Sequence, residues 1–190
     1  MAGVSGPLMR RSPAAGARFL VGLAVGGAAA GLIVSLPVYL VGRALTAAAP
    51  ESLRLLILAG VCLGFGIADL ANRTPHIWRQ VPQSFARELS PGLRGLIWGL
   101  DLGLLVTTQK AVSLVWVAIC AMALVAPAAA PALLVGMALA SSLSVTVWSL
   151  SPGALTIDHG GGRDKRWLRS IRALSGTAIL VAGAATLLSL

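Results

Sequence analysis

The sequence predicts an all-α fold, a polytopic bundle of transmembrane helices that forms one membrane domain over residues 18–190. Hydrophobic residues make up 57% of the 190 residues and charged residues only 11%, whereas soluble domains carry about 25% charged residues. The apolar residues gather in long blocks that are separated by basic residues. Because so few polar residues cannot coat a soluble globule, we expect lipid to surround most side chains.

The first two apolar blocks predict the first two spans. Residues 1–17 are small and polar, with two arginines, and we expect a cytoplasmic tail there. The block 19–42 is too long for the core of a cleaved signal, which is about 7–15 residues, so we expect a retained span. The second span is expected at about 53–71, with Asp69 near its end where it can reach the interface. The basic loop 72–94 carries an apolar stripe typical of an interfacial helix.

The third block, 95–126, is too long for one straight span. At about 1.5 Å per residue it makes a helix of about 48 Å, against a hydrocarbon core of about 30 Å. A polar cluster interrupts it, and we therefore expect one broken helix. Later spans are expected at about 132–150 and 172–190, joined by a basic loop at 151–171. The residues of the polar cluster are Thr107, Thr108, Gln109 and Lys110.

The distribution of basic residues favours five spans over six. If 95–126 crosses once, both long basic loops lie on the inner side, as the positive-inside rule requires. If it crosses twice, the basic residues divide almost evenly between the two sides. Five spans with a cytoplasmic N-terminus in the cell membrane is the preferred topology. Six spans, arranged as a 3+3 inverted repeat, is the alternative, because such repeats place equivalent loops on opposite faces.

Glycines at intervals of four predict close helix packing. In lipid, small residues at this spacing let two backbones approach, and van der Waals contact then holds the helices together. The spacing leaves open whether the partner helix belongs to this chain or to another membrane protein. The longest run is Gly95, Gly99 and Gly103, and shorter pairs are Gly22–Gly26, Gly27–Gly31 and Gly60–Gly64.

Asp101 is the main candidate for a charged functional residue, since its neighbours in the third block are apolar. A carboxylate at mid-membrane costs about 2.5–3.5 kcal/mol and therefore usually faces a partner or a wet cavity. The alternative is that Asp101 reaches water at the cytoplasmic end of its helix. In the five-span topology, the polar cluster 107–110 would line a cavity at a helix break. In the six-span topology, it would be a solvent-exposed turn between two helices.

Two further groups of residues have competing interpretations. Cys62 and Cys120 lie in apolar runs, where they form a membrane dithiol or are two small buried side chains. A basic cluster near the last span is expected to anchor anionic lipid headgroups, with docking of an acidic partner as the alternative. No catalytic residue, metal site, cofactor or nucleic-acid partner is predicted. The basic cluster comprises Arg163, Lys165, Arg166, Arg169 and Arg172.

The stretch Gly95–Ala118 resembles a helix of the CcdA/DsbD-type membrane thiol-disulfide carriers. In that family a glycine-spaced run leads into a Thr-Pro-Cys-like break, and here the run leads into Thr107, Thr108 and Gln109. Residues 19–40 are similar to the family's first helix. Ala29-Ala30 and Thr108-Gln109 stand where Pro-Cys is expected. The resemblance therefore implies the scaffold of the family without its redox cysteines.

The sequence as a whole predicts a non-enzymatic membrane protein that moves a small solute or ion past the broken helix, with Asp101 as its charged contact. The first alternative is an accessory or scaffolding subunit that packs against a larger membrane complex through its glycines. The second is a thiol-redox carrier that uses Cys62 and Cys120.

Overall fold

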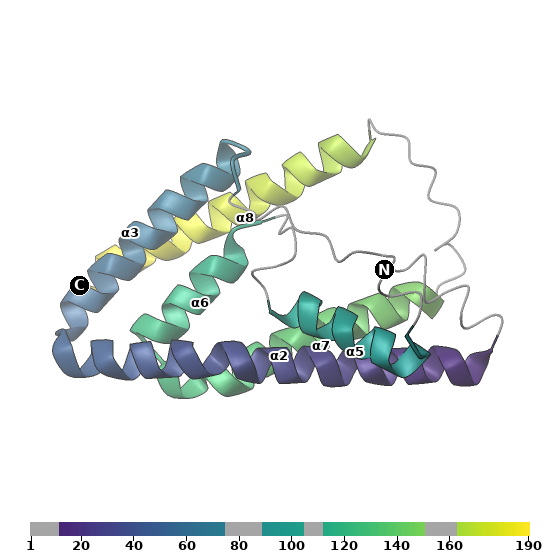
Figure 1. Ribbon diagram of the computed structural model, residues 1–190. Coiled ribbons are helices and arrows are strands. Elements are labelled where there is room, and N and C mark those ends of the chain that lie inside the picture. Colours follow the sequence, from purple (N-terminus) through teal and green to yellow (C-terminus); the bar gives the residue numbers. More distant parts are fainter. Residues whose placement is uncertain (1–11, 75–88, 105–111, 151–162) are drawn as a thin grey trace. The chain divides into compact units, whose positions relative to one another are not determined.

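The computed structural model describes residues 12–74, 89–104, 112–150 and 163–190 (Figure 1). Within these ranges the ordered elements are all helical, which confirms the predicted all-α class. The α-helices are α2 (Pro13–Ala48), α3 (Glu51–Leu70), α5 (Pro91–Gly103), α6 (Leu114–Leu124), α7 (Ala130–Leu150) and α8 (Arg163–Leu188), and a 3-10 helix, η1 (Pro127–Ala129), precedes α7.

Four of these helices, α2, α3, α7 and α8, are long and apolar enough to cross a bilayer. The 20 residues of α3 give a length of about 30 Å, which matches a hydrocarbon core. Large apolar side chains are widely exposed on these helices, for example Leu36 at 60% and Val181 at 63%. Such surfaces are stable in lipid and unfavourable in water, so the chain is a membrane-embedded protein.

Two helices extend well beyond the predicted spans. Helix α8 begins at Arg163, so the basic cluster 163–172 occupies its first turns, whereas the sequence predicted a loop there. Arginine and lysine have helix propensities similar to that of leucine, so a basic segment can continue the helix. At about 39 Å, α8 is longer than the hydrocarbon core of a bilayer, so its basic end can extend into the headgroup region. Helix α2 continues from Pro13 to Ala48 without interruption at Pro37.

The third apolar block forms two separate short helices. Helix α5 ends at Gly103 and α6 begins at Leu114. At about 20 Å and 16 Å, neither helix alone matches the thickness of a bilayer core. The predicted polar cluster 107–110 lies outside the described residues, as do the interfacial segment 75–88 and the loop residues 151–162.

The helices form two compact units. In the first unit, the start of α2 packs against α5 with backbone touching backbone. A Cβ atom on Gly99 would fall on the carbonyl oxygen of Leu23, and one on Gly26 would fall on that of Leu96. The predicted close packing is therefore confirmed for the glycines of α2 and α5, whereas it is wrong for the pair Gly60 and Gly64 of α3, where nothing lies within 4 Å of an added Cβ atom among the described residues. The partner of the α5 glycines is another helix of the same chain, because Gly95, Gly99 and Gly103 all face α2.

Helix α7 covers a neighbouring side of α2 in the same unit. A Cβ atom on Gly31 would lie 2.9 Å from the carbonyl oxygen of Leu134, and one on Gly27 would lie 3.0 Å from Ser142 Oγ. Phe19 is fully buried and meets Trp98 edge-on, with ring centroids 6.3 Å apart. Small residues thus let α5 and α7 both approach α2 closely.

In the second unit, α3 packs along α8 and also against the short helix α6 (Figure 1). A Cβ atom on Gly176 of α8 would lie 2.8 Å from the carbonyl oxygen of Gly66 of α3, so these two helices also meet closely. An apolar cluster fills the space between α3, α6 and α8. Its buried members are Leu58, Cys62, Val117, Leu124 and Ile179.

Candidate functional site

Asp69, near the C-terminal end of α3, is the most unusual residue of the second unit because its carboxylate is entirely inaccessible to solvent. The sequence led us to expect that Asp69 reaches the interface, and this prediction is wrong. The side chain turns inward among α3, α6 and α8. A charged group inside a membrane protein normally faces a partner or a functional cavity, so Asp69 is the candidate site.

The end of α3 brings the first partner to Asp69. Asn72 has a positive φ of 57°. The Asn72 N–H donates to the carbonyl oxygen of Asp69, and the N–H of Arg73 donates to the carbonyl oxygen of Ala68. This is a Schellman turn, in which asparagine is one of the few residues tolerated at the left-handed position. The turn reverses the chain and places the buried Thr74 hydroxyl 2.8 Å from Asp69 Oδ1.

The remaining donors come from α8 and from the residue that precedes α6. The Ser113 N–H donates to Asp69 Oδ2 at 2.9 Å and to Oδ1 at 3.2 Å, and the Ser113 hydroxyl donates to Oδ1 at 2.6 Å. The Ser175 hydroxyl of α8 donates to Oδ2 at 2.9 Å. Donors from three separate segments therefore converge on one carboxylate, the arrangement that an ionised acid requires.

Asp69 also acts as the N-terminal cap of α6. Ser113 occupies the N-cap position, yet its hydroxyl makes no capping bond to its own helix. The carboxylate accepts from the Ser113 N–H instead, at the positive end of the α6 dipole. An anion at this place gains about 0.3–1 kcal/mol, and up to about 2 kcal/mol when partly buried. This interaction offsets the unfavourable position of Asp69 at the negative end of its own helix.

No cationic side chain pairs with Asp69 within the described ranges. Arg172 is half-buried one turn before Ser175 on α8. Its guanidinium lies 3.5 Å from the carbonyl oxygen of Asn72, at the C-terminal end of α3. Arg73 and Arg169 are exposed. Among the residues that the structure describes, the carboxylate is therefore balanced by hydrogen bonds and by a helix terminus.

Arg54 makes the complementary contact at the opposite end of α6. It lies in the first turn of α3, and its Nη1 atom donates to the carbonyl oxygen of Leu124 at 2.6 Å, at the negative end of α6. A cavity of about 280 Å³ adjoins this contact. Helix α3 thus holds both ends of α6 with charges opposite to its dipole. The cavity is lined by Thr46, Glu51, Arg54, Leu55, Leu124 and Val125.

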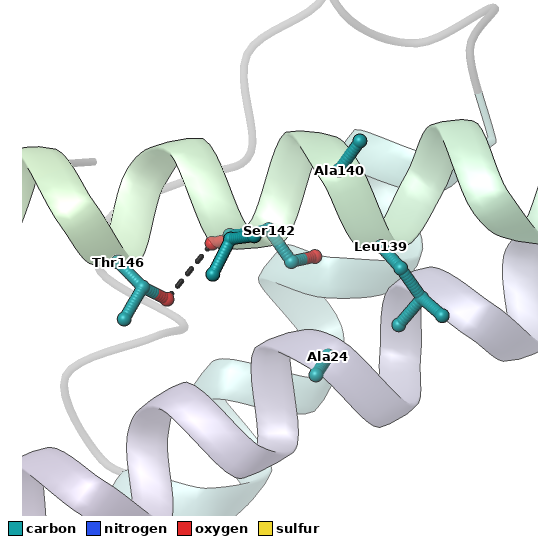
Figure 2. Close-up of a pocket in the computed structure, with 6 residues that line it drawn as sticks. Ala24, Leu139, Ala140, Ser142 and Thr146 are labelled. Atoms are coloured by element: carbon teal, nitrogen blue, oxygen red, sulfur yellow. Dashed lines mark hydrogen bonds between the residues drawn. The ribbon is translucent and has the colours of Figure 1, made fainter.

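The first unit contains a different cavity, of about 330 Å³, between Ala24 of α2 and one side of α7 (Figure 2). Its hydroxyls are engaged by their own helix, since Ser142 donates to the carbonyl oxygen of Ala138 and Thr146 to that of Ser142. Leu143, which also lines it, is 62% exposed. The cavity is mainly apolar, and we assign it no polar ligand.

The structure places the predicted site residues in separate regions. Asp101 is half-buried on α5 in the first unit. Cys62 and Cys120 are free thiols in the second unit and belong to the same apolar cluster. The side chains of 163–166 lie outside the described residues, as does the whole of 107–110.

The Asp69 site was not predicted from the sequence. The available signal was weak: Ser113 lies three residues after Lys110, and Ser175 lies three residues after Arg172, each at the start of an apolar run.

These observations define the class of the protein, a helical membrane-embedded protein with a buried carboxylate at the start of a short helix. Comparisons with models of protein families, with curated proteins and with solved structures find no match.

Proposed function

We propose that the chain is a non-enzymatic integral membrane protein that moves a small solute or ion across the bilayer, with Asp69 as its charged contact. The observation that carries the proposal is the fully buried carboxylate of Asp69, which has four donors and no cation among the described residues. Ionisable groups are retained inside membrane proteins chiefly on substrate, ion and proton pathways.

The position of Asp69 at the start of α6 supports the same function. Transporters commonly build their sites where a membrane helix is discontinuous, because the backbone groups at the break are free to bind charged species. Here α5 and α6 are two short helices formed from one apolar block, and Asp69 lies at the beginning of the second. The expected transport function therefore keeps its helix break, while the charged contact moves from Asp101 to Asp69.

Flux through liposomes tests this proposal. The purified chain is reconstituted, and proton flux is followed with an enclosed pH dye, sodium and potassium flux with radioactive tracers. We expect flux of at least one of these ions in the unmodified protein and its loss in Asp69→Asn. The controls are Asp101→Asn on α5 and Glu51→Gln at the exposed start of α3.

The outcomes separate the candidate residues. Flux that is lost in Asp69→Asn and kept in both controls supports the proposal. Flux that survives Asp69→Asn but not Asp101→Asn assigns the charged contact to α5 and overturns our choice. No flux of any of the three ions above that of protein-free liposomes overturns the transport function itself.

A second candidate function, an accessory subunit of a larger complex, is favoured by one observation on α3. Within the described part of the second unit, nothing lies within 4 Å of a Cβ atom placed on Gly60 or Gly64. Ile57 and Ile67 continue this exposed face. A glycine pair of this spacing without a neighbouring helix fits the close approach of a helix from another protein.

Co-purification tests the second candidate. We expect Gly60→Leu and Gly64→Leu to lose a stoichiometric membrane partner that the unmodified chain retains. The matched control is Gly136→Leu, because Gly136 of α7 is also exposed with nothing within 4 Å. Retention of the partner in both α3 variants would exclude this interface.

A further inference from the structure

We propose that the cavity beside Arg54 binds the phosphate group of a membrane phospholipid, and that the Arg54 guanidinium is its main contact. The cavity belongs to the second unit, where the end of α2, the start of α3 and the end of α6 line it. It is separate from Asp69, which lies near the other end of α3. The proposal therefore goes beyond the proposed function and does not depend on it.

Arg54 brings a positive charge to this cavity that no described residue balances. Within the described ranges its guanidinium donates from Nη1 to the carbonyl oxygen of Leu124, which carries no net charge. Its Nε atom is enclosed and has no acceptor among these residues. Enclosed donors are nearly always paired in native proteins, so Arg54 requires an acceptor from beyond the described residues. Guanidinium groups bind phosphate especially well, because their planar N–H donors match its oxygens.

The start of α3 adds to the attraction for an anion. Glu51 is the first residue of this helix and lines the cavity. Pro50 before it makes no side-chain hydrogen bond that caps the helix, so N–H groups of the first turn remain available. Such N–H groups and the positive end of a helix dipole bind phosphate. The opposing negative end of α6 is already engaged, because Arg54 donates to Leu124.

Glu51 is also the acidic residue among those that line the cavity. Its side chain is exposed, whereas that of Arg54 is half-buried. Water and salt screen an exposed charge more strongly than a partly buried one. The carboxylate of Glu51 therefore does not cancel the attraction of Arg54 for a phosphate.

The position and the size of the cavity favour a lipid phosphate over a free ion. The 20 residues of α3 span about 30 Å, so its start lies at the boundary of a hydrocarbon core, at the depth of lipid headgroups. Leu55 and Val125 add apolar lining, and Val125 is 49% exposed, so lipid chains can reach the cavity. Its volume of about 280 Å³ is below the range of about 300–1,000 Å³ for sites that enclose a whole ligand. A headgroup fits such a space while its acyl chains stay outside.

Native mass spectrometry tests the site on the full chain, purified in a maltoside detergent, which contains no phosphate. The chain is titrated with dioleoylphosphatidylethanolamine. Dioleoylglycerol serves as a lipid with the same acyl chains and no phosphate, and inorganic phosphate serves as the free anion. We expect phosphatidylethanolamine to bind on the order of tenfold or more tightly than dioleoylglycerol, the effect of hydrogen bonds to a charged group.

Two variants remove the site in different ways. Arg54→Met removes the cation, and we expect the affinity for phosphatidylethanolamine to fall on the order of tenfold. Arg43→Met is the matched control, because Arg43 is an exposed arginine of the same unit that does not line the cavity. Val125→Trp fills the cavity and keeps Arg54, so it should weaken binding equally without removing the contact to α6. Its control is Val181→Trp, at an exposed valine of α8.

Each outcome bears on one part of the proposal. Affinity that falls in Arg54→Met and Val125→Trp but not in their controls supports the site. Unchanged affinity in either of these two variants overturns it. Equal affinities for phosphatidylethanolamine and dioleoylglycerol overturn the phosphate contact. Inorganic phosphate that raises the unfolding temperature as much as phosphatidylethanolamine does at the same concentration overturns the lipid in favour of a free anion.

Discussion

Asp69 and Ser113 are joined by three hydrogen bonds, although 44 residues separate them along the chain. The Ser113 N–H donates to both carboxylate oxygens, at 2.9 and 3.2 Å, and its hydroxyl donates to Oδ1 at 2.6 Å. Helix α6 begins at the next residue, Leu114. In a membrane, free backbone N–H groups at a helix start need an acceptor from the protein. Asp69 supplies that acceptor for the Ser113 N–H, directly before the first residue of α6.

The first prediction concerns the stability that Asp69 contributes. In Asp69→Ala, the donors of Thr74, Ser113 and Ser175 lose their acceptor, and each buried unpaired donor costs about 1–3 kcal/mol. We expect the free energy of unfolding to fall by about 3 kcal/mol or more, measured by circular dichroism during unfolding with SDS. Glu51→Ala, an exposed carboxylate of the same helix, should change it by less than about 1 kcal/mol. Equal losses in the two variants would refute the assignment.

The second prediction separates Ser175 from its neighbour Thr177. Ser175→Ala removes a hydrogen bond to a charged group, worth about 1.5–3 kcal/mol. Thr177→Ala removes an exposed bond within its own helix, and we expect a change within about 0.5 kcal/mol. The same SDS titration measures both. If Thr177→Ala is as destabilising as Ser175→Ala, the bond to Asp69 is not the cause.

The third prediction concerns the glycine contact between α2 and α5. In Gly99→Ala the new methyl group would overlap the carbonyl oxygen of Leu23, so the helices must separate. We expect a loss of about 1–3 kcal/mol or more in the free energy of unfolding. Gly136→Ala has open space around it and should be neutral or stabilise by up to about 1 kcal/mol. A tolerated Gly99→Ala would show that α5 does not pack on α2 in this way.

The fourth prediction treats the two ends of α6 separately. Arg54→Met removes the donor to the Leu124 carbonyl, and Asp69→Asn weakens the acceptor for the Ser113 N–H. Hydrogen exchange by mass spectrometry should therefore quicken at the last turn of α6 in Arg54→Met and at its first turn in Asp69→Asn. Faster exchange along all of α6 in both variants would contradict two independent end contacts.

The fifth prediction addresses the number of spans. In a background of Cys62→Ala and Cys120→Ala, single cysteines replace Pro75 and Gly160 in the two long basic loops. Five spans place both cysteines on the cytoplasmic side, so a membrane-impermeant maleimide should label neither in intact cells and both after permeabilisation. Labelling of one cysteine before permeabilisation would establish that the loops lie on opposite sides, as six spans require.

The amino-acid sequence alone determined that this chain is a membrane protein, where its long apolar helices lie, and that glycines of the first and third apolar blocks pack closely. These properties depend on residues near one another in the chain, such as the run from Leu55 to Leu70 or the spacing of Gly95, Gly99 and Gly103. Apolar length and small-residue spacing are local quantities, so no knowledge of the neighbouring helix is needed.

Only the tertiary structure decided the role of Asp69. From the sequence it was a charged residue at the end of an apolar block, free to reach water, and Asp101 was the stronger candidate. Its burial depends on Ser113 and Ser175, which lie 44 and 106 residues further along the chain and reach it because α3 packs against both α6 and α8. Whether a buried charge is stable depends on groups that surround it in space, and helix packing brings those groups together.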